Sequence, residues 1–299
     1  MAKQVKAKRD IHQEITNNLI EIMDKGTLPW RKDWNGRGTV DLGMPNNPFT
    51  GSNYNGINIL LLWGTASNRG YSSNSWGTFN QIQKAGGMVR KGEKGTTVVL
   101  FKPLIKKGKP GDSGEAGENE IIPLMRHFTV FNLVQCDSVT IPKQKVIPEV
   151  DRIENAEKYI AGTDSNIIFG GDRACYMPGR DSIQMPQAGT FKSIQGYYAT
   201  MLHEHIHWTG SKDRLDRLTK CGFGSHDYAF EELVAELGAA FSCAALGIES
   251  DIENHASYLA NWLEKLREDK RYIFRAAAKA SKAVKFLNEL QTESEAVAA

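Results

Sequence analysis

Thr200-Met201-Leu202-His203-Glu204-His205-Ile206-His207-Trp208 contains the pattern H-E-x-x-H, which begins and ends with a histidine. On a helix, positions four residues apart lie on one face, so His203 and His207 can bind one metal ion from the same side. Glu204 lies beside the open coordination position, where a carboxylate can take a proton from water that the metal activates. The stretch therefore predicts a helix that carries a hydrolytic metal site.

The flanking residues also favour a helix. Gly210 is typical of a helix end. His205 points away from the ligand face, and we expect it to be exposed rather than coordinating. The alternative is an amphipathic helix with two packed or surface histidines, but carboxylates further along the chain favour the metal site. Apolar residues at helical spacing precede the motif, namely Ile194, Tyr197, Tyr198, Met201 and Leu202.

A second predicted helix, over residues 228–241, offers a third ligand, and catalytic zinc sites usually have three protein ligands. One side of this helix is apolar and the other carries small residues, so we expect it to be buried nearly all round. Glu232 and Glu236 lie four residues apart in it, and buried carboxylates need a partner. We assign Glu232 as the third ligand and Glu236 as the acceptor for the free N–H of a ligand histidine.

Asp213 is an alternative third ligand, because the sequence also reads H-E-x-x-H-x-x-G-x-x-D from His203 onward. Residues 212–217 resemble a solvated charge cluster, which favours Glu232 over Asp213. His226 is a weaker candidate.

The charge of the chain is divided unevenly. Residues 1–145 carry 20 Lys and Arg against 12 Asp and Glu, whereas residues 146–299 carry 17 against 23. A basic half joined to an acidic half suggests that the first binds a polyanion. We therefore predict two domains, 1–145 and 146–299, in an α+β chain. A polar, Gly-rich excursion at about 105–121 is expected to be flexible.

Aromatic rings alternate with cations in the basic half. Such platforms in a cationic groove suit single-stranded nucleic acid, where stacking contributes about 1–3 kcal/mol per base. Core packing of these rings is the alternative. The residues that we expect to bind DNA are Trp30, Arg31, Lys32, Trp34, Tyr54, Trp76, Arg90, Lys91 and Lys94.

The composition favours a cytoplasmic protein. The four cysteines form no C-x-x-C pair, and no apolar signal segment follows Met1. No apolar run approaches the roughly 18 residues of a membrane span, so no membrane partner is expected.

Several segments together resemble the plasmid antirestriction family ArdC and the related N-terminal region of plasmid conjugation primases. They are residues 29–30, 54–58, 86–96, 181–186, 203–210 and 231–237. The resemblance implies an N-terminal mixed α/β domain that binds single-stranded DNA and a C-terminal zincin-like metallopeptidase domain. It also implies protection of incoming plasmid DNA from host restriction during conjugation.

Two functions of different classes follow. The first is a metallopeptidase, loaded with zinc or with manganese or another divalent metal, that cleaves a DNA-associated protein or a host restriction enzyme. The second is a DNA-binding shield whose metal site is not catalytic. Glu204 favours the first, because a purely structural site needs no general base.

Overall fold

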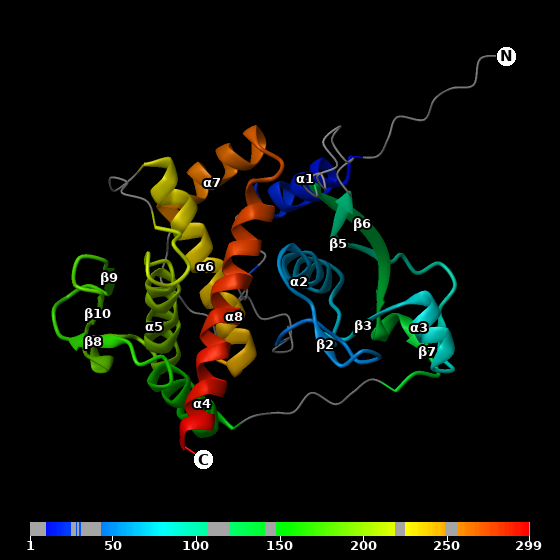
Figure 1. The fold of residues 1–299 in the computed structure, drawn as a ribbon. Coiled ribbons are helices and arrows are strands. Elements are labelled where there is room, and N and C mark those ends of the chain that lie inside the picture. Colours follow the sequence, from blue (N-terminus) through cyan, green and yellow to red (C-terminus); the bar gives the residue numbers. More distant parts are fainter. Residues whose placement is uncertain are drawn as a thin grey trace, which may run out of the picture. The chain divides into compact units, whose positions relative to one another are not determined.

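The computed structural model describes residues 10–24, 28, 30, 43–106, 120–140, 148–218, 225–248 and 256–298. The chain forms two compact units. The first unit contains helices α1 and α2 together with all elements from α4 onward, and the second contains β1 and the elements from β3 to β7 (Figure 1). This grouping differs from the predicted division into 1–145 and 146–299, because the N-terminal helices belong to the same unit as the C-terminal half.

Helices dominate the first unit. α6 packs against both α5 and α8, and the three lie side by side in Figure 1. α1 packs against α7, and α2 packs against α8. The helices are α1 (Ile11–Asp24), α2 (Ile57–Arg69), α4 (Glu149–Ala161), α5 (Ile194–Thr209), α6 (His226–Leu246), α7 (Ala256–Glu268) and α8 (Tyr272–Ala298), with the short 3-10 helix η2 (Ala188–Thr190) before α5.

Local sequence signals fix the ends of the two central helices. The Ser193 side chain caps α5 by accepting from the backbone N–H of Gly196, and Ser225 caps α6 in the same way through Tyr228. Gly247 ends α6 in the left-handed conformation, with φ of 73°, that glycine adopts without steric cost. The approach of α5 to α6 depends on Gly238, since a Cβ there would lie 2.7 Å from the Ile206 side chain.

α1 forms where the sequence predicts a helix. Asp10 accepts a hydrogen bond from the backbone N–H of Gln13, as an N-cap residue does. The buried apolar face of α1 comprises Ile11, Ile15, Leu19 and Met23. On the same side, the Thr16 hydroxyl donates to the carbonyl of Lys270 at 2.8 Å. The N-terminal helix thus completes its core with residues from the far end of the sequence.

A small sheet lies beside α5, the helix that carries the H-E-x-x-H pattern. Its strands are β8 (Asn166–Phe169), β9 (Cys175–Met177) and β10 (Ser182–Met185), in the order β8-β10-β9. β10 runs parallel to β8 and antiparallel to β9, so β9 is an edge strand of this sheet. Both β9 and β10 contact α5.

The second unit is built on the antiparallel sheet β3-β6-β5. Ile82, Leu133 and Cys136 form a small core beside it. Its elements are β1 (Asn46–Asn47), β3 (Trp76–Thr78), α3 (Phe79–Lys84), β4 (Met88–Val89), β5 (Thr96–Lys106), β6 (Glu120–Asn132), η1 (Leu133–Gln135) and β7 (Cys136–Asp137), while β2 (Ser52–Asn53) spans the boundary between the units.

Some expected segments differ in extent. Residues 105–106 and 120–121, expected in the flexible excursion, pair as the ends of β5 and β6. The remainder of the excursion, residues 107–119, lies outside the described residues. Among the described helices, none combines the length and apolar character required to cross a membrane.

Candidate metal centre

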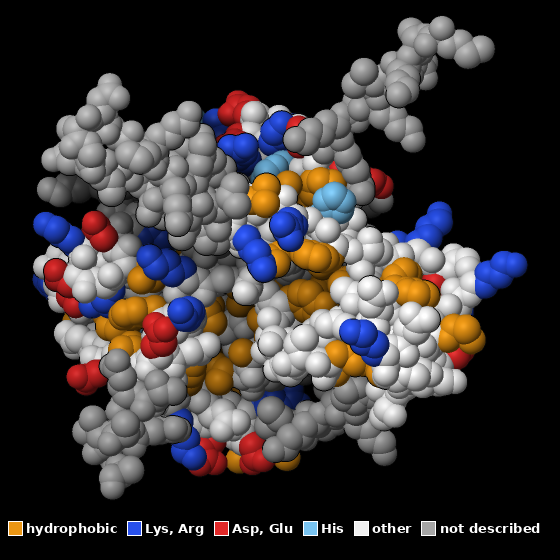
Figure 2. All heavy atoms as spheres, turned by 45° about the vertical axis from the view of Figure 1, so that its right-hand side comes forward, with side chains coloured by type: hydrophobic (Ala, Val, Ile, Leu, Met, Phe, Trp, Pro, Cys, Tyr) orange, Lys and Arg blue, Asp and Glu red, His pale blue; other side chains and the backbone are white. Residues whose placement is uncertain are grey.

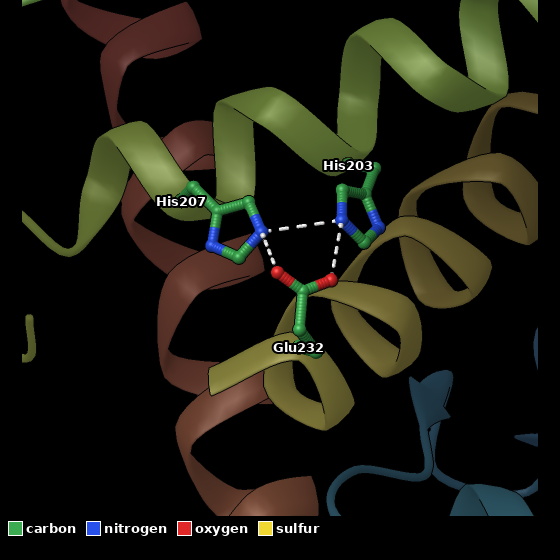
Figure 3. A group of neighbouring side chains, drawn as sticks. All are labelled: His203, His207 and Glu232. Carbon is green, nitrogen blue, oxygen red and sulfur yellow. Dashed lines mark hydrogen bonds and ion pairs between the residues drawn. The ribbon is translucent and has the colours of Figure 1, made fainter. Parts of the chain in front are cut away.

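Three side chains from α5 and α6 converge on one point (Figure 3). The Nε2 atoms of His203 and His207 lie 3.2 Å apart. Glu232 places Oε2 3.5 Å from His203 Nε2 and Oε1 3.5 Å from His207 Nε2. These ligand atoms all lie within 4.8 Å of one another, so a single cation can reach all of them. Two imidazoles and one carboxylate are a donor set that is also found in catalytic zinc sites.

The three side chains are largely shielded from water. The His203 and Glu232 side chains are each 6% exposed and that of His207 is 13% exposed. A carboxylate removed from water in this way is costly unless an opposite charge or hydrogen bonds compensate it. The histidines and a divalent metal would supply that compensation.

Glu231 supports the ligand His207. Its Oε1 lies 3.2 Å from His207 Nδ1, the nitrogen that faces away from the ligand cluster. Arg217 holds Glu231 in turn through two nitrogens, each 2.8 Å from a carboxylate oxygen. The sequence predicts that Glu236 accepts the free N–H of one of the two histidines, and Glu236 is buried one helical turn beyond Glu232. At His207 the acceptor is Glu231, whose carboxylate faces the Nδ1 nitrogen of this ring.

The carboxylates and histidines of the cluster shift one another's pKa values. Burial alone would lower the pKa of His207, but its contacts with Glu231 and Glu232 outweigh burial and raise the pKa to about 10. Burial also opposes the charge on His203, yet Glu232 raises the pKa of that ring above its usual value. The pKa of Glu232 is held well below its usual range by both histidines, although burial acts in the opposite direction. The negative charge of Glu232 therefore favours a positive charge beside it, on the two histidines.

Glu204 lies at the same cleft, whose volume is about 730 Å³ and whose walls include both histidines and Glu232. The side chain is buried, and Oε2 accepts a hydrogen bond of 2.7 Å from the backbone N–H of Tyr176 in β9. The cleft also contains Arg173 and Lys279, both exposed to solvent. A carboxylate, a cluster of metal-ligand atoms and an open cleft are the components of a hydrolytic site.

The alternative ligands lie elsewhere. Asp213 and His226 are exposed and do not belong to the ligand cluster. His205 does point away from the ligands, but the expectation that it is exposed is wrong, since none of it is accessible. Its Nδ1 lies 2.7 Å from the Met201 carbonyl and its Nε2 lies 2.9 Å from the Ser165 hydroxyl. Burial lowers its pKa to about 4, so this histidine is neutral and structural.

The residues expected to bind DNA have mixed placements. Trp30 and Trp76 are only 4% and 1% exposed, and Trp30 packs against Trp262 with ring centroids 6.2 Å apart. Neither ring can stack on a base in this conformation, which corrects the expectation. Tyr54 is half-buried. Three residues of the set, Arg31, Lys32 and Trp34, lie outside the described residues.

The cations of the glycine-rich loop divide into two kinds. Arg90 donates to Glu93 at 3.0 Å, to Asp137 at 3.4 Å and to the Val134 carbonyl at 2.6 Å. These bonds give Arg90 a role in holding the loop. Lys91 and Lys94 are exposed, as an interaction with phosphates requires.

A mixed surface on the β5–β6 ladder was not predicted from the sequence. Leu100 lies opposite Arg126 and Lys102 lies opposite Leu124, and alternate residues of a strand share a face. Phe128 lies on this face too, opposite the buried Val98. We call Leu100, Lys102, Leu124, Arg126 and Phe128 the β5–β6 face; all five are exposed. Alternation of apolar and cationic residues along both strands was the signal that could have revealed it.

Two known families match the sequence. Residues 9–131 match the N-terminal domain of anti-restriction factor ArdC, and residues 154–279 match a zincin-like metallopeptidase family. The metal-free crystal structure of the antirestriction ArdC protein from plasmid R388 is 40% identical, with a TM-score of 0.78 over 95% of this chain and 99% of that chain. The chain belongs to the ArdC family. The sequence resemblance to ArdC and the α+β fold class with two family domains are thereby confirmed.

Further relatives include a metal-bound structure, a protein of similar length and a longer primase. An Mn(II)-bound structure of the R388 ArdC protein is 38% identical, with a TM-score of 0.75 over 95% of this chain and 98% of that chain. Uncharacterized protein y4eC of Sinorhizobium fredii is 38% identical over 96% of this chain and 94% of its own length. DNA primase TraC of Escherichia coli is also 38% identical over 94% of this chain, which spans 27% of the primase. The zincin-like domain and the Mn(II)-bound relative both imply a divalent metal.

Proposed function

We propose that this chain is a metal-dependent peptidase of the zincin type that serves in antirestriction. His203, His207 and Glu232 hold the metal, and Glu204 is the general base. The observation that carries the proposal is the convergence of His203, His207 and Glu232, two of them buried and His207 partly buried, with Glu204 on the wall of the same cleft. A shield without catalysis would not require this carboxylate.

The residues of the chain divide the chemistry among them. A bound divalent metal supplies a Lewis acid that polarises a carbonyl and acidifies water. Glu204 accepts a proton from water in the cleft and can deliver it to the leaving amine. Glu231, held by Arg217, fixes the ring orientation of His207. Zinc suits two nitrogens and one carboxylate, and manganese is the alternative that a relative's structure supports.

A second component of the proposal is binding of single-stranded DNA by the second unit. On the β5–β6 face, the exposed ring of Phe128 and two apolar side chains lie beside Lys102 and Arg126. Figure 2 shows hydrophobic side chains next to Lys and Arg side chains on one side of the molecule. Exposed rings stack on unpaired bases while cations follow the phosphates. Lys91 and Lys94 extend the cationic set, and the half-buried Tyr54 stays a candidate.

The two components give a coherent role in the cytoplasm. We infer that the chain binds incoming single-stranded plasmid DNA and cleaves a protein found on DNA, such as a host restriction enzyme. The supporting observations are the membership in the ArdC family and the cationic, apolar β5–β6 face.

The deciding experiment compares wild type with Glu204→Gln. The variant should keep one divalent metal per chain and its stability, yet lose peptide hydrolysis and protection of conjugating DNA. Glu289→Gln, an exposed carboxylate on α8, is the matched control and should behave as wild type. If Glu204→Gln protects DNA as well as wild type, the non-catalytic shield is the correct function.

A further inference from the structure

The candidate base Glu204 is held by an amide of the neighbouring sheet. The backbone N–H of Tyr176 donates to Glu204 Oε2 at 2.7 Å, although Tyr176 belongs to the edge strand β9. An edge strand offers its outward amides to solvent or to an added strand. Here that amide is engaged by a carboxylate of α5. The bond fixes one carboxylate oxygen and thereby orients the other.

The side chain of Tyr176 forms hydrogen bonds with Asp181 and Arg214. Its hydroxyl donates to Asp181 Oδ1 at 2.7 Å. Arg214 donates from Nη1 to Asp181 Oδ2 at 3.1 Å and from Nη2 to the Tyr176 hydroxyl oxygen at 3.2 Å, and Nη2 also contacts Asp181 Oδ1. A forked guanidinium on a carboxylate is a strong and directional contact. Tyr176 is therefore fixed through both its backbone and its ring.

Arg214 connects this network to the metal-binding helix. Its Nε donates to the Trp208 carbonyl at 2.7 Å, and its guanidinium carbon lies 4.0 Å from the centroid of the Trp208 ring. Trp208 directly follows the ligand His207 on α5. The same arginine thus contacts the end of the ligand helix and the strand that holds Glu204.

Asp181 lies in the turn between β9 and β10. Its φ is 45°, in the left-handed region, which Asp adopts more readily than most residues other than glycine. Arg214 holds the pKa of Asp181 below its usual range, so the carboxylate is charged at neutral pH.

We propose that Asp181 and Arg214 are positioning residues for Glu204, acting through Tyr176. They hold the Tyr176 ring, the ring fixes the strand, and the strand amide sets the orientation of the Glu204 carboxylate. This inference rests on the proposed peptidase function for its catalytic meaning, while the positioning itself can be measured without catalysis.

The test is amide hydrogen exchange of Tyr176, followed by NMR in the full-length chain. Tyr176→Phe removes only the hydroxyl that contacts Asp181, and Asp181→Ala removes the acceptor. Each should speed exchange of this amide by about 5–10-fold, the factor expected when one hydrogen bond is removed. Asp181→Asn keeps an acceptor oxygen and should restore much of the protection. Tyr198→Phe is the matched control, because Tyr198 lies on α5 and its hydroxyl donates to Glu157 at 2.7 Å, away from this network.

The kinetic arm separates positioning from general stability. In a wild-type protein that cleaves peptide, Tyr176→Phe should lower kcat by about tenfold, as expected for a misplaced general base, with KM and metal content unchanged. Wild-type exchange of the Tyr176 amide in both Tyr176→Phe and Asp181→Ala overturns the proposal, as does faster exchange with unchanged kcat. If wild type cleaves no peptide, the proposed peptidase function fails, and the exchange rates alone decide whether Asp181 and Arg214 hold Glu204.

Discussion

Nε of Arg217 lies 2.8 Å from Oε2 of Glu231, so a cation holds the carboxylate that faces the ligand His207. The two side chains are 4% and 11% exposed. A buried ion pair is weak evidence for added stability, because the cost of desolvating both charges offsets their attraction. Its location behind a ligand histidine indicates that the orientation of the imidazole is what the pair maintains.

Glu231→Gln should weaken metal binding by about 10–100-fold, the usual effect of losing a partner of a ligand histidine. The amide keeps the shape of the side chain but loses the charge that orients His207. A chelator-competition titration measures the affinity. Glu236→Gln, also buried in α6, is the control and should change affinity by a smaller factor. Equal weakening in the two variants would show that Glu236 supports metal binding as much as Glu231 does.

Substitution at the third ligand should distinguish the two sequence candidates. Glu232→Ala removes a carboxylate that lies 3.5 Å from each histidine and should abolish stoichiometric metal binding. Asp213→Ala alters an exposed side chain and should leave metal content unchanged. Elemental analysis after gel filtration measures both. The reverse pattern would transfer the ligand role to Asp213.

Metal loading should release protons at neutral pH. The pKa of His207 is raised from 6.5 to about 10, so the folded, metal-free chain holds a proton that the metal must displace. Apparent affinity should therefore rise with pH, by up to about tenfold per unit for each proton released. The proton on His207 also stabilises the metal-free fold. This stabilisation is complete below about pH 6.5 and is lost as the pH rises through about 10. Calorimetry in buffers of different ionisation enthalpy counts the protons, and a count of zero would contradict the electrostatic argument.

A fragment of residues 1–145 should fail to fold as the intact chain does. It retains α1 and α2 but lacks α7 and α8, the helices against which they pack. In the full chain, Leu19→Ala should cost about 2–5 kcal/mol, because it opens a cavity in this shared core. Urea unfolding followed by circular dichroism measures both effects. Native-like cooperative unfolding of the fragment would show that its helices need no C-terminal partner.

Phe128→Ala should weaken binding of single-stranded DNA while leaving its salt dependence unchanged, since it removes stacking of about 1–3 kcal/mol per base. Arg126→Ala or Lys94→Ala should instead flatten the dependence of log affinity on log salt, by about 0.7 for each phosphate that the protein no longer neutralises. Anisotropy titrations of the full chain over a salt series measure both quantities. Val150→Ala, a substitution of a 74% exposed side chain in the first unit, is the control. Equal or tighter binding to duplex would exclude stacking on the β5–β6 face.

The structure brings His203, His207 and Glu232 together. Helical periodicity predicts that the two histidines share one face of α5, and Glu232 lies on α6, which packs against α5. The partner of His207 was harder to predict, since choosing Glu231 over Glu236 requires the rotation of α6 against α5. That rotation depends on the approach of Gly238 to Ile206, which has no local signature. The sequence predicts surface rings at Trp30 and Trp76 because aromatic residues lie beside cations or glycines in the basic half. Their burial depends on residues distant in the sequence, such as Trp262 for Trp30.

The packing of α1 against α7 has an evolutionary consequence. Helices α1 and α7 belong to one unit and pack together, so recombination in the middle of the chain would separate packing partners. We therefore expect the N-terminal and C-terminal halves to be inherited together as one cassette. The match to the TraC primase agrees with this expectation, since it covers 94% of the present chain within a much longer protein. Fusion to new activities is expected at the ends of such a cassette, where the shared core stays intact.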